Sequence, residues 1–178
     1  YYIACAADEI WAHPTTITGS IGVIVMLPDL SRLASNLGIG VDVVKSGPMK
    51  DMGSFLKPLG PEERRAFAGL VDEAYERFLG LVWDSRRGRV FPDGRENTLE
   101  YWRRLADGRI YTANQALENG LVDALGYRED AIARLKELTE LKEATVVEYH
   151  PPRKGLLDLL GASASAKAQD PADPAEYP

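Results

Sequence analysis

Lys50 is the residue whose type and position best suit it for chemistry. It follows a run at 41–44 that is β-branched except for Asp42 and predicts a strand. A break at 46–48 comes between them, where Gly47 and Pro48 predict a turn. A loop just beyond a buried strand is where α/β proteins place catalytic groups. Lysine acts as a general base only when burial lowers its pKa from about 10.4 toward neutrality. The alternative is an ordinary solvated loop lysine.

A lysine base needs a serine within reach, so the serines of the chain are candidate partners. Ser46 and Ser54 lie four residues before and after Lys50, which differs from the Ser-x-x-Lys spacing of a helical pair. Ser20 lies in a second predicted strand at 15–26, beside glycines that indicate a close approach of the backbone. Its hydroxyl is suited to hydrogen-bond the amine of Lys50 and hold it in place. The alternative is a strand serine that is satisfied by the backbone.

The sequence offers little support for other kinds of site. His13 and His150 each precede a proline and have no further ligand at metal-binding spacing, and neither a phosphate loop nor a Ser-His-Asp arrangement is visible. The single cysteine, Cys5, excludes an intrachain disulfide and is expected to be a small buried side chain. The net charge of −6 argues against a nucleic-acid partner. The longest apolar run, 21–27, is far shorter than the about 20 residues that span a membrane.

The elements that must position these residues alternate between helix and strand. After an apolar helix over 1–7, the pattern predicts strands at 10–12, 15–26 and 41–44. Between the last two, a helix is predicted to begin after Asp29 as its N-cap and to end at Gly38. This alternation indicates the α/β class.

The second half of the chain predicts mostly helices. Pro61 opens a long helix that reaches Trp83, and its apolar stripe predicts a core-facing or oligomer-contact surface. The stripe consists of Phe67, Leu70, Val71, Ala74, Tyr75, Phe78 and Val82. The remaining predictions are a helix after Thr98, a strand after Arg109, a helix over 113–119 capped by Thr112, a strand-like segment at 121–123, a helix over 130–141 and a strand over 144–149.

The composition changes near Pro151. We predict one domain over 1–150 and a peripheral segment with a disordered tail over 151–178, where the leucines at 156–160 are suited to dock as a short amphipathic turn. The chain opens directly on Tyr1-Tyr-Ile, which is core-like sequence, so further structure is expected upstream.

Five segments carry a resemblance to a known family. They are Tyr-Tyr-Ile-Ala-Cys-Ala-Ala-Asp-Glu-Ile at 1–10, Thr-Ile-Thr-Gly-Ser-Ile-Gly-Val at 16–23, Lys-Ser-Gly-Pro-Met-Lys-Asp at 45–51, Asp-Gly-Arg-Ile-Tyr-Thr at 107–112 with Gln-Ala at 115–116, and Gly-Leu-Val-Asp-Ala-Leu-Gly at 120–126. In this order and spacing they resemble the signal peptide peptidase A (protease IV) family. The resemblance implies a Clp-protease/crotonase-like β-β-α superhelix, incomplete at the N-terminus, with residues 1–150 as the C-terminal portion of one peptidase domain.

The resemblance implies a serine–lysine peptidase without cofactor or metal. Lys50 matches the general base and Ser20 the serine that orients it, while the nucleophile belongs to a Ser-Gly-Gly-Tyr-Tyr motif and would lie just upstream of Tyr1. The helix predicted over 1–7 would then follow the nucleophile. Substrates would be signal peptides or other hydrophobic peptides, and Met49, Met52 and Ile21 are expected to exclude water from the lysine. On this reading, the chain alone should be inactive.

Family members also form rings, in some of which the serine and lysine come from different subunits or domains. The resemblance therefore implies a homo-oligomer, with the helix over 61–83 and the segment 121–125 as candidate interfaces, and an N-terminal membrane anchor with an extracytoplasmic peptidase domain. Two alternatives stay open at this point. One is a non-catalytic peptide-binding or assembly domain of the same fold. The other is a crotonase-type acyl-CoA enzyme, for which Asp8, Glu9 and Asp51 would be candidate carboxylates.

Overall fold

The structure is a computed structural model, and it describes residues 1–147 and 149. The chain divides into two compact units, Tyr1–Glu140 and Leu141–Pro178. All helices and strands of the described residues lie in the first unit. His150 and the tail predicted over 151–178 lie outside the described residues, so the domain boundary expected near residue 150 stays a prediction.

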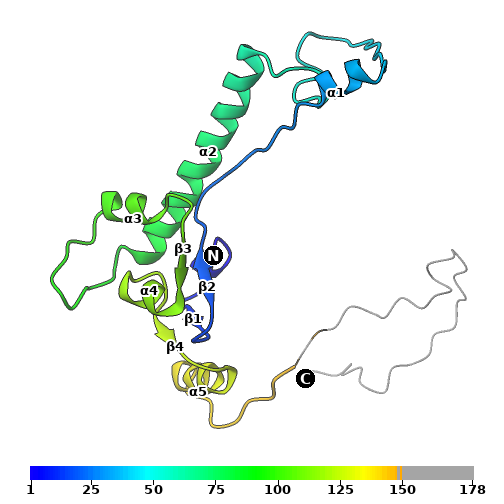
Figure 1. The fold of residues 1–178 in the computed structure, drawn as a ribbon. Coiled ribbons are helices and arrows are strands. Elements are labelled where there is room, and N and C mark those ends of the chain that lie inside the picture. The colour runs from blue at the N-terminus through cyan, green and yellow to red at the C-terminus, as the bar shows by residue number, and fades with distance from the viewer. Residues whose placement is uncertain (148, 150–178) are drawn as a thin grey trace, which may run out of the picture. The chain divides into compact units, whose positions relative to one another are not determined.

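Two small sheets and several short helices form the base of the first unit (Figure 1). Strand β1 (Trp11–Ala12) pairs in parallel with β4 (Ala124–Leu125), and β2 (Ile17–Gly19) pairs antiparallel with β3 (Ile110–Thr112). The helices are η1 (Ala4–Ala6, a 3-10 turn), α3 (Leu99–Leu105), α4 (Ala113–Glu118) and α5 (Arg128–Leu138). This mixture of helices and strands agrees with the α/β class.

Two of the three helix caps predicted from the sequence are confirmed, whereas the N-cap of the helix predicted after Asp29 is Leu30, with no side-chain cap. The Thr98 hydroxyl accepts a hydrogen bond from the Tyr101 amide at the start of α3, and the Thr112 hydroxyl accepts one from Gln115 at the start of α4. The Gln115 side chain accepts in return from the Thr112 amide, which completes a capping box. These signals lie within four residues of chain, so the sequence alone reveals them.

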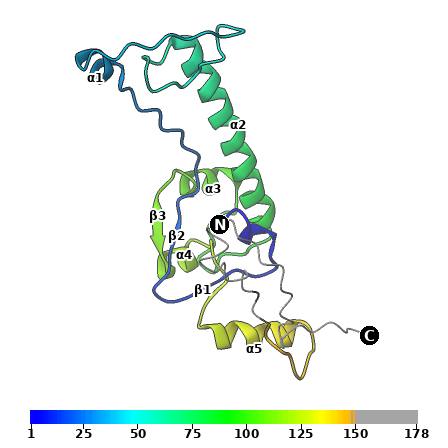
Figure 2. The ribbon, with the colours of Figure 1, turned by 90° about the vertical axis from the view of Figure 1, so that its right-hand side faces the viewer.

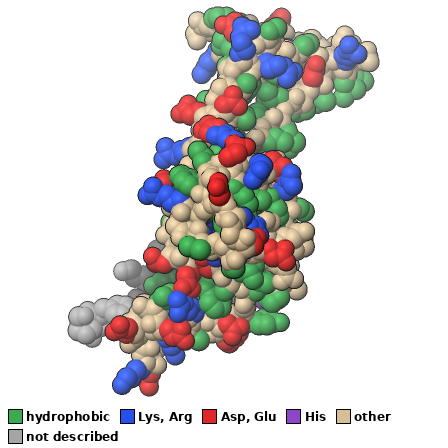
Figure 3. Space-filling view, turned by 90° about the vertical axis from the view of Figure 1, so that its left-hand side faces the viewer, with side chains coloured by type: hydrophobic (Ala, Val, Ile, Leu, Met, Phe, Trp, Pro, Cys, Tyr) green, Lys and Arg blue, Asp and Glu red, His purple; other side chains and the backbone are tan. Residues whose placement is uncertain are grey.

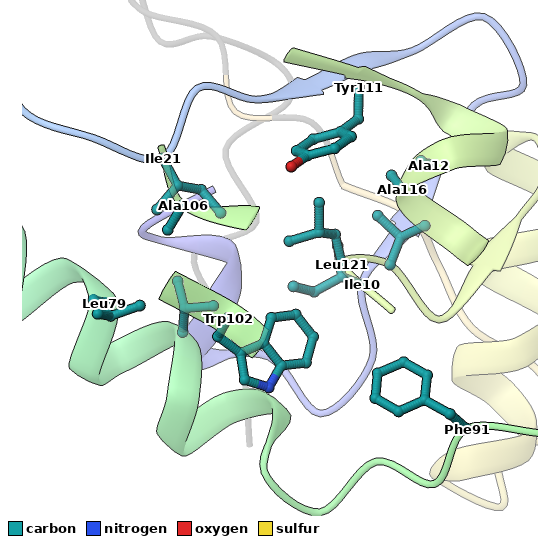
Figure 4. Packing of buried hydrophobic residues seen from close by; sticks show 12 residues of the cluster. Ile10, Ala12, Ile21, Leu79, Phe91, Trp102, Ala106, Tyr111, Ala116 and Leu121 are labelled. Carbon is teal, nitrogen blue, oxygen red and sulfur yellow. The ribbon is translucent and has the colours of Figure 1, made fainter. Parts of the chain in front are cut away.

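The hydrophobic core lies where the C-terminal half of α2 (Pro61–Arg86) meets α3, α4 and the strands (Figure 4). Trp102 on α3 is wholly buried, and its indole nitrogen donates a hydrogen bond of 2.7 Å to the Asn97 side chain. Its wholly or almost wholly buried neighbours in this core come from α2 and from the segments beside the strands: Leu79, Val82, Ile21, Leu121 and Val122. The core therefore fixes the positions of β2, β3 and the segment at 121–122 against α2.

Helix α2 begins at Pro61, as predicted, and extends to Arg86. Its 26 residues correspond to about 39 Å. Only the C-terminal part of the predicted apolar stripe reaches the core, because Val82 is buried and Phe78 packs against the core, whereas Leu70 is 57% exposed. The N-terminal half instead contacts the segment that we call the arm, residues 22–60, through Val25 and Leu27. Figures 1 and 2 show the arm leaving β2 and carrying α1 (Ser31–Asn36) near the N-terminal end of α2.

Two strand predictions in and before the arm are wrong. Of the strand predicted over 15–26 only Ile17–Gly19 is formed, and residues 41–44 form no strand at all. Ile24 and Val44 are 75% and 103% exposed. These runs have strand propensity, but no segment within residues 1–147 pairs with them. A strand is stabilised by its partner, which local sequence does not specify.

Other predicted elements are shorter or displaced. The helix predicted over 1–7 is only the 3-10 turn η1. The helix predicted after Asp29 is confirmed as α1 (Ser31–Asn36), and the Asp29 carboxylate accepts hydrogen bonds from the amide and hydroxyl of Ser31. The strand expected at 121–123 forms instead at Ala124–Leu125, since β1 pairs there. Among residues 144–147 and 149 no strand is formed.

Candidate active site

Ser20 lies at a strained turn directly after β2. Its backbone φ is 50°, in the left-handed region, and it follows Gly19, whose φ is 92°. The Ser20 amide donates to the Arg109 carbonyl at 2.8 Å, and the Gly108 amide donates to the Ile21 carbonyl at 3.0 Å. The pairing of β2 with β3 therefore continues through Ser20. A serine in this conformation at the end of a strand is a candidate functional residue.

The Ser20 hydroxyl is exposed and makes no hydrogen bond with the described residues. The alternative, in which the Ser20 hydroxyl hydrogen-bonds the backbone, is therefore not observed. The hydroxyl is free to interact with a group that approaches from outside the turn.

Gly19 is required for this turn. A Cβ atom there would lie 2.8 Å from the Arg109 carbonyl oxygen and 2.7 Å from the Tyr111 ring, besides requiring a left-handed backbone. Gly19→Ala is expected to lower the free energy of unfolding by about 1–3 kcal/mol, as measured by urea denaturation. Gly40→Ala is the control, because nothing lies within 4 Å of a Cβ at Gly40. Equal stability of the two variants would contradict the role assigned to Gly19.

A pocket of about 420 Å³ opens beside Ser20. Tyr75 of α2 and Ile24 line it together with the turn at Asp107–Gly108. Residues 22–24, which line it, make no backbone hydrogen bond with the described residues. The pocket thus combines an apolar wall with unpaired extended backbone. Tyr75 is not recognisable as a site residue from the sequence, because its place in the apolar stripe of the helix indicates only a core role.

Lys50 lies in a series of tight turns within the arm. Its amide donates to the Gly47 carbonyl at 3.2 Å, and the amides of Met52 and Ser54 donate to carbonyls three residues earlier. The Lys50 side chain is exposed and has no partner among the described residues. Ile21, expected to shield it, is instead wholly buried in the core. The described residues therefore do not form the water-excluding environment predicted around Lys50.

The structure does not bring Lys50 and Ser20 together. The turn that carries Lys50 packs on α2 near Phe67, since a Cβ at Gly53 would lie 2.9 Å from the Phe67 ring. The pocket beside Ser20 reaches α2 at Tyr75. Eight residues of helix separate these two levels, which corresponds to about 12 Å along its axis.

Charged side chains surround the turn that carries Lys50. Asp51 accepts from Lys45 at 2.8 Å and pairs with Lys57 at 2.9 Å, and Lys57 also pairs with Glu63 in the first turn of α2. The hydrogen bonds from Lys45 and Lys57 hold the pKa of Asp51 at about 2. From the sequence Asp51 is a candidate catalytic carboxylate, whereas in the structure it forms ion pairs.

A second charged cluster fixes the beginning of the chain. Asp123 accepts from Arg86 and Arg89, each at 2.7 Å, and from the Ile10 amide. The Tyr1 hydroxyl donates to the Leu121 carbonyl at 2.6 Å, and burial raises the pKa of Tyr1 to about 12. In the sequence Asp123 is recognisable only as part of the motif at 120–126. Its pairing with two distant arginines does not follow from residue spacing.

The histidine and cysteine positions have local contacts. The His13 ring hydrogen-bonds the Thr15 hydroxyl and packs edge-on against Tyr127, and Cys5 is partly buried with its pKa raised by burial. Within residues 1–147 and 149, no three potential ligands cluster in a way that could hold a metal ion. Nor does any helix of this part of the chain have the length and apolar character to cross a membrane.

Comparison of the sequence with known proteins identifies the family of this chain. Residues 1–142 match Peptidase family S49. The chain is 43% identical over 149 residues to a protein of Enterococcus faecium provisionally named signal peptide peptidase SppA, covering 84% of this chain and 41% of that protein. It is 33% identical over 160 residues to Protease 4 of Salmonella typhi, covering 90% of this chain and 24% of that protein. It is 32% identical over 170 residues to the chloroplastic serine protease SPPA of Arabidopsis thaliana, covering 93% of this chain and 24% of that protein. The chain thus spans less than half the length of these relatives. It belongs to peptidase family S49.

Proposed function

We propose that the protein of which this chain forms part is a serine peptidase that uses a serine–lysine pair. The observation that carries this proposal is the family match over residues 1–142, which contains both Lys50 and Ser20. Lys50 is the general base, Ser20 orients it, and the nucleophile is a serine in a Ser-Gly-Gly-Tyr-Tyr stretch that ends at Tyr1 and Tyr2. The name of the Enterococcus faecium relative favours signal peptides as substrates, and we extend this to other hydrophobic peptides.

The proposed reaction is acyl transfer. The neutral amine of Lys50 accepts the proton of the nucleophilic serine while the serine oxygen attacks the peptide carbonyl. The resulting ammonium donates that proton to the leaving amine as the peptide bond breaks. A water molecule then gives a proton to the amine and attacks the acyl-enzyme. As the acyl bond breaks, the ammonium returns that proton to the serine oxygen, which restores the serine and releases the acid product. The pocket beside Ser20 would hold a substrate side chain during both steps.

We further propose that a neighbouring copy, or another part of the longer protein, completes the site. Within one chain the turn of Lys50 and the pocket of Ser20 meet α2 at different levels, and Lys50 is exposed. The apolar residues at 41–44 have no partner strand among the described residues, and Val44 is fully exposed. Acidic and basic side chains are interspersed over the face shown in Figure 3, so no single-sign patch there opposes association. A ring on a Clp-protease-like superhelix, anchored in the cell membrane with its peptidase domain extracytoplasmic, is the assembly that we propose.

The role of Ser20 can be tested by substitution. Ser20→Ala in the full-length protein is expected to lower kcat for an apolar peptide substrate by about 10–100-fold, because a misplaced base transfers protons poorly. Ser46→Ala is the matched control, since Ser46 is an exposed serine nearer to Lys50 in sequence. Wild-type kcat in Ser20→Ala, or an equal loss in Ser46→Ala, would refute the assignment.

A further inference from the structure

We propose that Asp51 is a positioning residue, which holds the turn that carries Lys50 in place by binding a lysine on each side of that turn. This inference rests on the proposed role of Lys50 as the base. It adds a residue that acts on the reaction through Lys50 rather than by touching the substrate.

The geometry of the turn supports this role. Lys45 precedes the turn and Lys57 follows it, and the Asp51 carboxylate binds both ammonium groups through one oxygen, at 2.8 and 2.9 Å. Lys45 also donates to the Pro48 carbonyl at 3.0 Å, inside the turn. The two ends of the segment are thereby joined across Lys50, although no regular structure holds them.

The same network attaches the turn to α2. Lys57 pairs with Glu63, and the second carboxylate oxygen of Glu63 accepts from the Gly60 amide at 3.1 Å, in the first turn of the helix. The side chains of Asp51 and Glu63 are only 15% and 8% exposed, so water screens these pairs less than it screens surface pairs. A long helix that is anchored in the core at its other end therefore fixes the location of the turn.

The charges of the network balance without Lys50. Lys45 and Lys57 offset Asp51 and Glu63, and Arg64 of α2 adds a positive charge where it lines a pocket with Phe67. The free amine of Lys50 is thus left without a carboxylate of its own. Because the pKa of Asp51 is held at about 2, Asp51 is ionised wherever a peptidase of this kind would be assayed, and it cannot itself cause an acid limb in the rate profile.

Asp51→Asn in the full-length protein tests the proposal. We expect kcat for an apolar peptide to fall about 10–100-fold with little change in KM, because the base is displaced but the substrate pocket is intact. We also expect the acid limb of the pH–rate profile to move to lower pH, since the loss of the Asp51 charge leaves Lys45 and Lys57 unbalanced and makes the surroundings of the turn more positive, which disfavours the ammonium form. A purely structural role would change the melting temperature without moving this limb. Asp51→Glu, which keeps the charge, should recover a large part of kcat.

Asp42→Asn is the matched control, because Asp42 is an exposed aspartate of the same arm. Wild-type kcat and an unmoved acid limb in Asp51→Asn, with Lys50→Ala inactive, would overturn the positioning role and leave the proposed function intact. An active Lys50→Ala variant would instead overturn the proposed function. If Asp51→Asn does not fold, Lys45→Gln and Lys57→Gln each remove one of the two bridges, and wild-type kcat in both would overturn the inference.

Discussion

Lys50→Ala is expected to lower kcat/KM of the full-length protein for a peptide substrate by about a thousandfold, within the range for loss of a general base. The substitution removes the only group proposed to take the proton of the nucleophile. Thermal stability should be unchanged, because the Lys50 side chain is exposed and makes no hydrogen bond or ion pair with the described residues. Steady-state kinetics and thermal denaturation of the same preparation measure the two quantities.

Two further variants separate the base role from a role of the positive charge. Lys50→Arg keeps the charge but cannot lose its proton in water, so it should be as inactive as Lys50→Ala. Lys142→Ala, at an exposed lysine outside the arm, should have wild-type activity. In the wild-type protein kcat/KM should rise with pH along the acid limb as the amine becomes neutral. Substantial activity in Lys50→Arg would show that charge, not proton transfer, is what the reaction requires.

Asp123→Asn is expected to lower the free energy of unfolding by about 3 kcal/mol, at the lower end of the range for breaking a buried ion pair. Asp123 is the carboxylate bound by both Arg86 and Arg89, and the Arg86 side chain is only 5% exposed. Two other nitrogens of Arg86 have no partner among the described residues, so its charge depends strongly on Asp123. The lower end applies because the Asp123 side chain is itself 24% exposed.

Urea denaturation measures this effect, with Asp72→Asn on the exposed face of α2 as the control. Arg86→Met should cost less than Asp123→Asn, since Asp123 would still bind Arg89 and the Ile10 amide. In the double variant the two costs should not add, because both single changes disrupt one pair. Additive costs, or a stability of Asp123→Asn equal to that of the control, would contradict the central role of this pair.

The helices of the fold were predictable because their signals are local. Pro61 with its following acids, the caps at Thr98 and Thr112, and Asp29 before α1 each act within one turn of chain. The strands were less predictable. Residues 41–44 have the composition of a buried strand but are exposed, because strand formation depends on a partner that is distant in sequence or outside this chain.

The sequence by itself determined the family, most helix positions and the two residues proposed to act as base and orienting serine, since residue identity and motif order suffice for these. Only the tertiary structure showed that the turn of Lys50 and the pocket of Ser20 meet α2 at different levels. It also showed that Asp51 joins the ends of the Lys50 turn and that Asp123 binds two distant arginines. The physical reason is that ion pairing, burial and strand pairing depend on which distant residues come together in space. A local pattern specifies a residue's own conformation but not its tertiary neighbours.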